Sequence, residues 1–214
     1  MLMRFAKECD AGQLARLQWV CTKDLPGSFM TQLGERFLVE YHRTLLRQKS
    51  TIVLCAEEEG QIVAMVCGTL DAAEDMSALR RNRLKIALAC VPALLRHPGL
   101  LGKALTRVRN NPGDDNGFIV TSGARLSLWA CLPEYRGGTI AVQLLRAWLS
   151  MARVLGLGCV RLEVNQGNRV EGLHRALGAR LVKTFVTPSG VERKMMEYVL
   201  DADPQRPTAP ASGH

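Results

Sequence analysis

The sequence predicts an α/β protein with a central mixed, mainly antiparallel sheet of about seven strands flanked by helices. The chain has 214 residues and is 47% hydrophobic, which is enough for one sizeable core. Along it, short strand-like runs and runs of helical period follow one another. Two regions, 51–71 and 180–200, each hold two strand-like runs joined by a short turn, as antiparallel hairpins do. We therefore expect a single domain over residues 1–200.

The first part of the chain predicts one strand, two helices and a hairpin. The strand is expected over 2–8 and an amphipathic helix over 11–23. Pro26-Gly27 then breaks the chain, and Ser28 is a suitable N-cap for a second helix. In that helix, apolar side chains recur every fourth residue: Phe29, Leu33, Phe37, Tyr41 and Leu45. Both strands of the hairpin 51–71 are almost continuously apolar, which predicts burial on both faces.

Residues 72–117 interrupt this order with an insertion rich in Leu, Ala and Arg. Pro92 and the sequence His97-Pro98-Gly99 are expected to split it into one or two helices. The order then resumes with strand 124–132, helix 138–155, strand 159–165, a short helix 168–177 closed by Gly178, and strands 180–186 and 192–200. The tail 201–214 is polar and rich in Pro and Ala, which predicts disorder.

The cysteines and the N-terminus indicate the compartment. The seven cysteines stand singly and mostly within apolar runs, at Cys9, Cys21, Cys55, Cys67, Cys90, Cys131 and Cys159. Because no pair has the spacing of a zinc or redox motif, we expect reduced thiols and no metal site. The N-terminus lacks the apolar core of a signal peptide, and no apolar run approaches the roughly 20 residues that span a bilayer. These features predict a cytoplasmic protein.

The net charge of +8 is concentrated in the insertion. Residues 76–113 hold eight Lys or Arg and no Asp or Glu. Such asymmetry indicates a local anionic partner, which is a phosphate, a nucleic acid or a membrane surface. The aromatic content of 5% and the lack of a stacking motif argue against nucleic acid.

The stretch LPEYRGGTIAVQLLRAWL, residues 132–149, places two glycines where an amphipathic helix begins. The first-turn amides of a helix have no partner within it, and the positive end of the macrodipole lies there. A preceding loop without Cβ atoms lets an anion come close to these amides. The alternative is that Gly137-Gly138 only makes a turn.

The stretch LPEYRGGTIA resembles the pyrophosphate loop of the GNAT acyltransferase superfamily, whose motif is Pro-x-Tyr/His-Arg-Gly-x-Gly-x-Gly/Ala between a strand and a helix. LGLGCVRLEVNQGN resembles the next strand of that family and its following Asn, and LHRALGARLV resembles its Leu-Tyr-x-x-x-Gly-Phe. The resemblance is strong over about 125–186. It implies a GNAT-like fold with a helical insertion between the third and fourth strands.

The resemblance also implies acetyl-CoA as cofactor and a set of residues that hold it. The amides of Arg136, Gly137, Gly138, Thr139, Ile140 and Ala141 are then expected to bind the diphosphate. The backbone of Ala130, Cys131 and Leu132 is expected to pair with the pantetheine arm, and Asn168 to lie near that arm. For Cys131, a small core residue is the alternative.

Three departures from the family pattern stand out. Thr139 replaces the usual second loop glycine; its Cβ narrows the approach, although its amide and hydroxyl can still donate. Ala179 replaces the aromatic residue after Gly178, which indicates a packing change. His174 stands where many members have the tyrosine that protonates the leaving thiolate.

The resemblance implies an N-acetyltransferase that moves the acetyl group directly from the thioester to an amine. His174 is the candidate proton donor, since an unperturbed imidazole titrates near pH ~6.5; the alternative is a solvated histidine. Glu163 alternates away from its apolar neighbours and is the candidate base, with Asp71 as the other. The alternatives are an ion pair for Glu163 and a helix cap for Asp71.

The acceptor is expected to be a small-molecule amine, anionic or lipid-linked, because the basic insertion is placed to cover the acceptor side. Residues 76–113 also resemble an interfacial amphipathic helix, so peripheral membrane contact is one expectation. A plain hydrophobic cap or a homodimer surface is the other. The alternative functions are transfer of a longer acyl chain from acyl-CoA or an acyl carrier protein, and a non-catalytic module that binds an anionic membrane or nucleic-acid surface.

Overall fold

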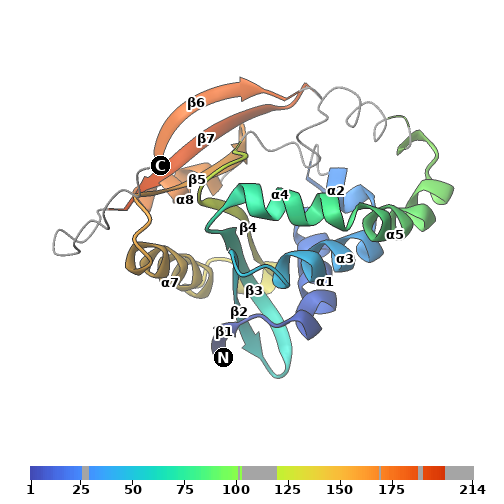
Figure 1. Ribbon diagram of the computed structural model, residues 1–214. Helices are drawn as coiled ribbons and strands as arrows, with labels where there is room; N and C mark the ends of the chain where they lie inside the picture. The colour runs from blue at the N-terminus through green and yellow to red at the C-terminus, as the bar shows by residue number, and fades with distance from the viewer. Residues whose placement is uncertain (26–28, 101, 103–119, 169, 188–189, 201–214) are drawn as a thin grey trace, which may run out of the picture.

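The computed structural model describes residues 1–25, 29–100, 102, 120–168, 170–187 and 190–200 (Figure 1). Its seven strands are β1 Leu2–Phe5, β2 Thr51–Glu58, β3 Gln61–Thr69, β4 Arg125–Cys131, β5 Cys159–Asn165, β6 Arg180–Val186 and β7 Glu192–Val199. They form one sheet in the order β1-β2-β3-β4-β5-β7-β6. All neighbours are antiparallel except β4 and β5, which are parallel. The mixed, mainly antiparallel sheet predicted from the sequence is confirmed.

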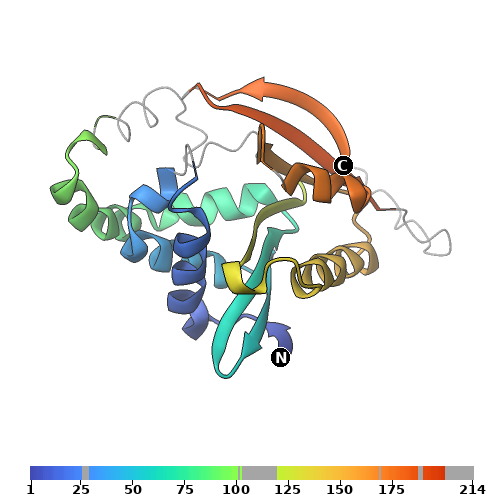
Figure 2. The ribbon, with the colours of Figure 1, turned by 180° about the vertical axis from the view of Figure 1, so that it is seen from behind.

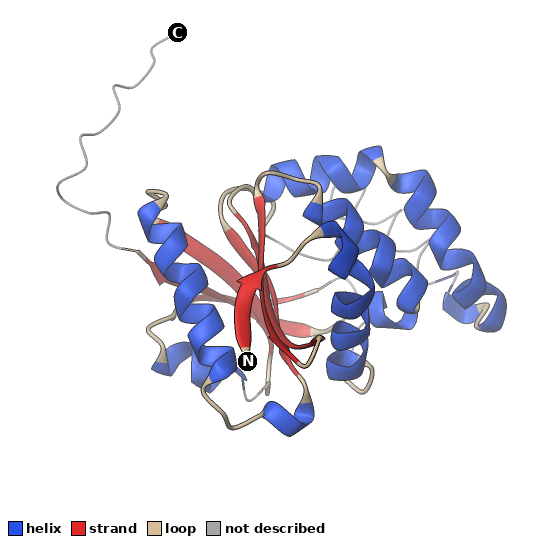
Figure 3. Cartoon of the chain, turned by 90° about the horizontal axis from the view of Figure 1, so that it is seen from below, coloured by secondary structure: helices blue, strands red, loops and turns tan. Residues whose placement is uncertain are grey.

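Helices cover both faces of this sheet (Figure 3). The first layer holds α1 Ala11–Thr22, α2 Phe29–Gln32, α3 Glu35–Leu46, α4 Ala72–Arg81 and α5 Arg83–Arg96. The other holds α7 Ile140–Val154 and α8 Val170–Ala176. Two short 3-10 turns, η1 Glu8–Asp10 and η2 Pro133–Tyr135, precede α1 and follow β4. In Figures 1 and 2, α5 and α7 lie at opposite ends of the molecule.

Two expectations about helices are wrong. The helix predicted from Ser28 is broken into α2 and α3, because Gly34 between them has φ +88°, outside the helical range. Ser28 itself lies outside the described residues. Pro92 does not split the insertion but lies inside α5, and the break comes at Asn82 between α4 and α5. A proline within a helix leaves the carbonyl four residues earlier unpaired, and here that residue, Leu88, is on the exposed face, where water can solvate it.

The core lies between the sheet and the two helical layers. Trp148 of α7 is fully buried, and its Nε1 donates to the Ile52 carbonyl at 3.1 Å, which fixes α7 against β2. The helical period of α7 and the almost unbroken apolar run of β3 place their apolar side chains in this core, as predicted. The insertion beyond Leu100 and the tail 201–214 lie outside the described residues, Gly102 excepted.

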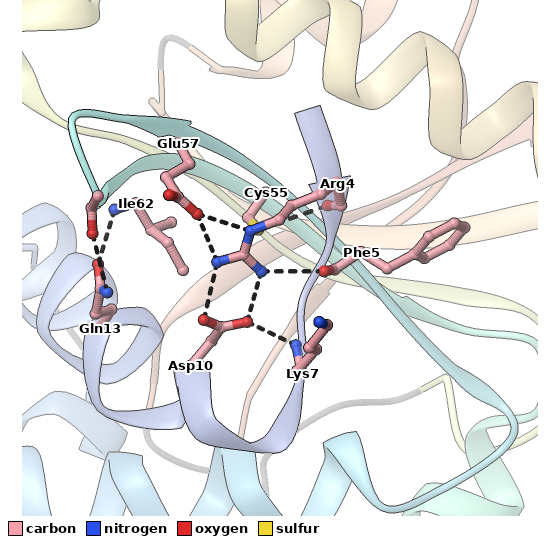
Figure 4. A network of polar contacts seen from close by, with 9 residues as sticks. Arg4, Phe5, Lys7, Asp10, Gln13, Cys55, Glu57 and Ile62 are labelled. Carbon is pink, nitrogen blue, oxygen red and sulfur yellow. Dashed lines mark hydrogen bonds and ion pairs between the residues drawn. The ribbon is translucent and has the colours of Figure 1, made fainter. Parts of the chain in front are cut away.

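One partly buried arginine connects the N-terminal strand to the rest of the fold (Figure 4). Arg4 of β1 donates to both carboxylate oxygens of Asp10, at 2.7 and 2.9 Å, and from Nε to Glu57 of β2 at 2.7 Å. Asp10 also accepts the Lys7 amide at 2.7 Å. The Arg4 guanidinium lowers the pKa of the Asp10 carboxyl, so the pair stays charged. Strand β1, the start of α1 and β2 are thereby held together.

Candidate active site

The sheet opens between its two parallel strands. β4 and β5 pair only through Arg125–Arg161 and Leu126–Leu162, although the strands continue to Cys131 and Asn165. A register shift between Cys67 and Gly68 of β3 makes Ser127 the extra residue of a β-bulge where this pairing ends. Beyond the bulge, no described strand pairs with the β5-facing edge of β4. The backbone of that edge is available to another extended molecule.

The loop after β4 leads directly from this edge to α7. The Leu132 amide donates to the Val63 carbonyl at 2.9 Å, which ends the β3 ladder, and η2 then turns the chain. The Tyr135 hydroxyl donates to the Glu58 carboxylate at 2.5 Å, which raises the pKa of Tyr135 to about 12 and ties the loop to the β2–β3 hairpin. Gly137 has φ +86°, a conformation that a side chain disfavours, and a Cβ on Gly138 would lie 3.3 Å from the Tyr135 carbonyl. The backbone conformation of the loop therefore explains why both positions of the sequence motif are glycine.

The loop presents unpaired amides to solvent. Of the predicted donors, the amides of Arg136 and Gly138 are used within the loop, by the Pro133 carbonyl at 3.1 Å and the Tyr135 carbonyl at 3.4 Å. The first helical bond of α7 runs from the Gln143 amide to the Thr139 carbonyl. No described residue accepts from the amides of Gly137, Thr139, Ile140, Ala141 and Val142. Residues 136–139 are exposed, while Ile140 is buried and Ala141 and Val142 are half-buried, so an anion can approach these donors from the side of the loop.

The three residues expected to meet the pantetheine arm, the last two of β4 and the one after it, differ in access. Ala130 is buried and pairs with Met65, and Leu132 is buried and its amide donates to the Val63 carbonyl. Cys131 is half-buried, and its carbonyl accepts from Cys21 Sγ at 3.2 Å and Arg136 Nε at 3.4 Å. An arm that bonds to this carbonyl must therefore displace one of these two weak donors.

A row of three rings joins β4 to β7 on the side of α7 and α8. Trp129 donates from Nε1 to the Ala141 carbonyl at 2.9 Å, and its ring centroid lies 5.1 Å from that of His174. His174 Nδ1 in turn lies 2.8 Å from the Tyr198 hydroxyl. Trp129 and His174 thus lie beside the opening of the sheet and the start of α7.

His174 is a buried residue and not a solvated one, which corrects the alternative drawn from the sequence. Its side chain is 2% exposed, and burial lowers its pKa to about 4. At neutral pH it is a neutral imidazole. If the Tyr198 hydroxyl donates to Nδ1, the proton is on Nε2, for which no described residue provides a partner. The arrangement suits a hydrogen-bond donor better than a positively charged acid.

Glu163 is held in the sheet by contacts with Val120 and Arg193. It accepts the Val120 amide at 3.0 Å and an Arg193 guanidinium NH at 3.4 Å, and its side chain is only 1% exposed. An ion pair, the alternative to the role of base, is thus present at Glu163, and its partner is Arg193. Val160 pairs with Tyr198, which contacts His174 of α8, so Val160 lies on the sheet face that α8 covers. Side chains alternate between the two faces along a strand, so Glu163, three positions after Val160, lies on the opposite face. The structure does not bring Glu163 and His174 together on one face.

The other two polar candidates have local structural contacts. Asn168 Oδ1 accepts the Val170 amide at 3.0 Å in the first turn of α8. Asp71 accepts the Ala73 amide at 2.9 Å and is the N-cap of α4, which confirms the helix-cap alternative. Among the described residues, no group of His, Cys, Asp or Glu is placed to hold a metal ion.

A cavity lies elsewhere, between α1, α2 and the end of α5. Its volume is about 850 Å³, and it is lined by Trp19, Lys23, Thr31, Gln32, Gly34, Ala93, Arg96, His97, Pro98, Gly99 and Leu100. Lys23 Nζ lies 5.0 Å from the centre of the Trp19 ring. These described lining residues include two cations and no carboxylate, so the cavity favours an anionic group beside an apolar one.

Sequence reasoning missed Trp129, Tyr135 and Tyr198. Tyr135 lies inside the recognised loop motif, so its position was available as a signal. Trp129 and Tyr198 carry no local signal, because their contacts with α8 join residues 45 and 24 positions apart.

No protein-family model matches the chain, and no curated protein matches its sequence significantly. Solved structures do match its fold. The ribosomal-protein-S18-alanine N-acetyltransferase from Escherichia coli has a TM-score of 0.58 at 11% identity, covering 97% of this chain and 99% of that one. The GNAT-family acetyltransferase from Streptococcus pneumoniae has 0.58 at 16%, covering 93% and 98%. The PaiA N-acetyltransferase from Thermoplasma acidophilum, solved with coenzyme A, has 0.56 at 13%, covering 93% and 99%. From its N-terminal strand to its last hairpin, the chain has the fold of the GNAT acetyltransferases.

Proposed function

We propose that the protein is an N-acetyltransferase that moves an acetyl group from acetyl-CoA to an amine. The observation that carries this proposal is the set of five unpaired amides at the exposed start of α7, directly after the unpaired edge of β4. α7 is 15 residues long, and its first turn has no acidic residue, so a diphosphate there is favoured by both the amides and the helix dipole. The likeness to a structure solved with coenzyme A supports the same assignment.

In this proposal each backbone segment has one task. The amides of Gly137, Thr139, Ile140 and Ala141 hold the diphosphate, while those of Arg136 and Gly138 brace the loop. The edge of β4 near Cys131 holds the pantetheine arm. Asn168, which is half-buried at the start of α8, is proposed to lie near that arm. When bound, acetyl-CoA supplies the thioester.

Direct transfer needs a free amine, a polarised carbonyl and a proton for sulfur. The amine nitrogen forms a bond to the acetyl carbon, the carbon–sulfur bond breaks, and one proton passes from nitrogen to sulfur. Neutral His174 is proposed to donate a hydrogen bond from Nε2, with Tyr198 fixing the tautomer. Glu163 is proposed to take the amine proton through water, because its own oxygens are committed to Val120 and Arg193.

We place the acceptor in the cavity between α1, α2 and α5. Lys23 and Arg96 line it, and no described lining residue is acidic, so the acceptor is expected to carry a carboxylate or phosphate besides its amine. Trp19 and Leu100 give it an apolar wall. Loss of both cations in a Lys23→Ala/Arg96→Ala variant is expected to raise the acceptor KM and leave that of acetyl-CoA unchanged.

Thermal melting with acetyl-CoA, free CoA and longer acyl-CoAs tests the cofactor. A ligand at a hundred times its Kd is expected to add roughly 2.7 kcal/mol to stability. A larger shift with a longer chain would favour the long-chain alternative, and no shift with any of them would overturn the enzymatic proposal.

A pair of glycine variants locates the site. Gly137→Ala places a side chain at φ +86°, which costs about 1–2 kcal/mol, so the free loop relaxes and CoA affinity falls about fivefold or more. Gly156→Ala has a similar conformational cost, at φ +80°, but lies beyond the other end of α7. Equal CoA affinity in both variants would show that the loop is not the site.

A further inference from the structure

The outward side of α5 carries a row of large apolar side chains that nothing in the described chain covers. Leu84, Leu88, Val91 and Leu95 are 75%, 71%, 42% and 80% exposed. Their spacing of four, three and four residues places them on one face of the helix. Such a continuous apolar face is unlike the single exposed apolar residues of an ordinary surface.

The opposite side of the same helix is also apolar, and it is packed. Cys90 is buried, and Ile86, Ala93 and Leu94 are partly buried, Ile86 and Leu94 against the core. A helix that is apolar all round is normally covered on every side. Because α5 lies at the outer end of the molecule, away from α7, its second apolar face points outward (Figures 1 and 2).

Cations border this row on both sides. Arg83 and Lys85 are the residues directly before and after Leu84, and Arg96 directly follows Leu95. Each of these cations therefore lies about 100° around the helix from the leucine next to it. No described carboxylate forms an ion pair with any of these three. Arg80 and Arg81 add two cations at the end of α4, and residues 76–100 contain no Asp or Glu.

The charge decides between two occupants for the apolar row. A second copy of the chain would bring two rows of arginine and lysine together without any acidic residue of this segment to pair with them, which is unfavourable. An anionic lipid surface takes the apolar side chains below its headgroups and pairs its phosphates with the bordering cations.

We propose that α5 is an interfacial helix that binds the protein to the surface of an anionic membrane. Leu84, Leu88 and Leu95 enter the boundary of the acyl chains, while Arg83, Lys85 and Arg96 reach the phosphates. The attachment is peripheral: among the described residues, no helix is both long and apolar enough to cross a bilayer. Arg96 also lines the cavity proposed for the acceptor, but the apolar row takes no part in the acetyltransferase proposal, and vesicle binding is measured without any transfer reaction.

Vesicle co-sedimentation of the full chain tests it. Binding is expected to vesicles of phosphatidylcholine with phosphatidylglycerol, to be weak on phosphatidylcholine alone, and to fall as salt is raised. Leu84→Gln/Leu88→Gln/Leu95→Gln is expected to lower the partition coefficient at least tenfold. Arg83→Gln/Lys85→Gln/Arg96→Gln is expected to lower it about fivefold per cation on anionic vesicles only.

The matched control removes exposed apolar side chains elsewhere. Val182 and Val186 of β6 are 49% and 66% exposed, and Val182→Gln/Val186→Gln is expected to bind vesicles like the wild type. Melting and far-UV circular dichroism confirm that each variant is folded. The proposal is overturned if the wild type does not bind anionic vesicles at low salt, or if the leucine triple variant binds as well as the control. A concentration-dependent dimer that the leucine triple variant abolishes, without any vesicle binding, would assign the row to self-association instead.

Discussion

At the scale of single residues, Gly68 shows how tightly α7 is packed on the sheet. A Cβ there would lie 2.8 Å from Trp148 Cε2 and 2.9 Å from the Arg125 carbonyl, and Trp148 is fully buried. Gly68→Ala is therefore expected to destabilise the protein by about 1–3 kcal/mol in urea unfolding. Gly12→Ala is the control, because a Cβ at that position of α1 meets nothing within 4 Å; it is expected to stabilise by about 0.5–1 kcal/mol. A tolerated Gly68→Ala would contradict this packing.

His174 is the residue whose chemistry departs most from the sequence expectation. With its pKa lowered to about 4, the imidazole stays neutral in the usual assay range, so kcat is expected to show no limb near pH 6.5 from this group. His174→Phe is expected to lower kcat about 100-fold or more. Tyr198→Phe is expected to lower kcat by less, because it removes only the hydrogen bond that fixes the tautomer of His174. A pH–rate profile of the three proteins checks this. An unchanged kcat in His174→Phe would reject the role.

At the scale of elements, the Arg4–Asp10 pair fixes β1 to the rest of the sheet. Asp10→Asn is expected to cost about 2 kcal/mol at pH 7, because it weakens a partly buried, doubly bonded ion pair. Since the pKa of Asp10 is lowered on folding, this stabilisation is present above the unfolded pKa of about 3.9 and is lost as pH falls through the folded value.

Urea unfolding of wild type and Asp10→Asn at pH 7 and at successively lower pH measures this difference, which should shrink as pH falls through the folded pKa of Asp10. Glu8→Gln is the control, with the same charge change in an exposed pair with Arg47, and is expected to have little effect. A difference that persists unchanged in acid would argue against the ion pair as its origin.

The loop before α7 is also held in place by a contact with another element, the β2–β3 hairpin. Tyr135→Phe removes its bond to Glu58, so the loop is expected to be less ordered and the Kd for CoA to rise severalfold. Glu58→Gln keeps an oxygen acceptor and is expected to lose less affinity. Calorimetric titration of CoA into both variants separates the two, and equal affinity in Tyr135→Phe and wild type would show that this tie does not shape the site.

At the scale of the whole molecule, two buried histidines make stability depend on pH. His42 Nε2 bonds to Gln18 Oε1 at 2.8 Å, and burial lowers the pKa of His42 to about 4, as it does for His174. Below pH ~6.5 the unfolded chain takes up protons that the folded chain does not take up until about pH 4. Stability is therefore expected to fall as pH is lowered from 6.5 to 4, by up to about 1.4 kcal/mol per pH unit for each histidine.

Urea unfolding at pH 7, 6 and 5 checks this slope. His42→Asn removes one titrating group and is expected to make the slope shallower, even if its stability at pH 7 is lower. A slope that does not change would mean that His42 does not remain neutral in the folded state.

Local patterns predicted most of the elements of this fold. Strands β5 and β6 were predicted at their observed bounds, because alternating or unbroken apolar runs fix strands and Gly178, with φ +97°, marks the end of α8. The failures came where backbone geometry overrode the pattern: Gly34 broke a continuous apolar face, and Pro92 was accommodated within α5. Neither outcome can be read from side-chain periodicity.

By itself, the sequence determined the order of strands and helices and the loop whose two glycines leave the α7 amides accessible, since these depend on residues close together in the chain. Only the tertiary structure decided that β4 and β5 separate after Leu126, that Trp129, His174 and Tyr198 form one row, and that Glu163 lies on the opposite face. It also decided that His174 is neutral and that the outer face of α5 is uncovered. The physical reason is that pairing, burial and the resulting pKa values depend on contacts between residues distant in the sequence, which no local pattern encodes.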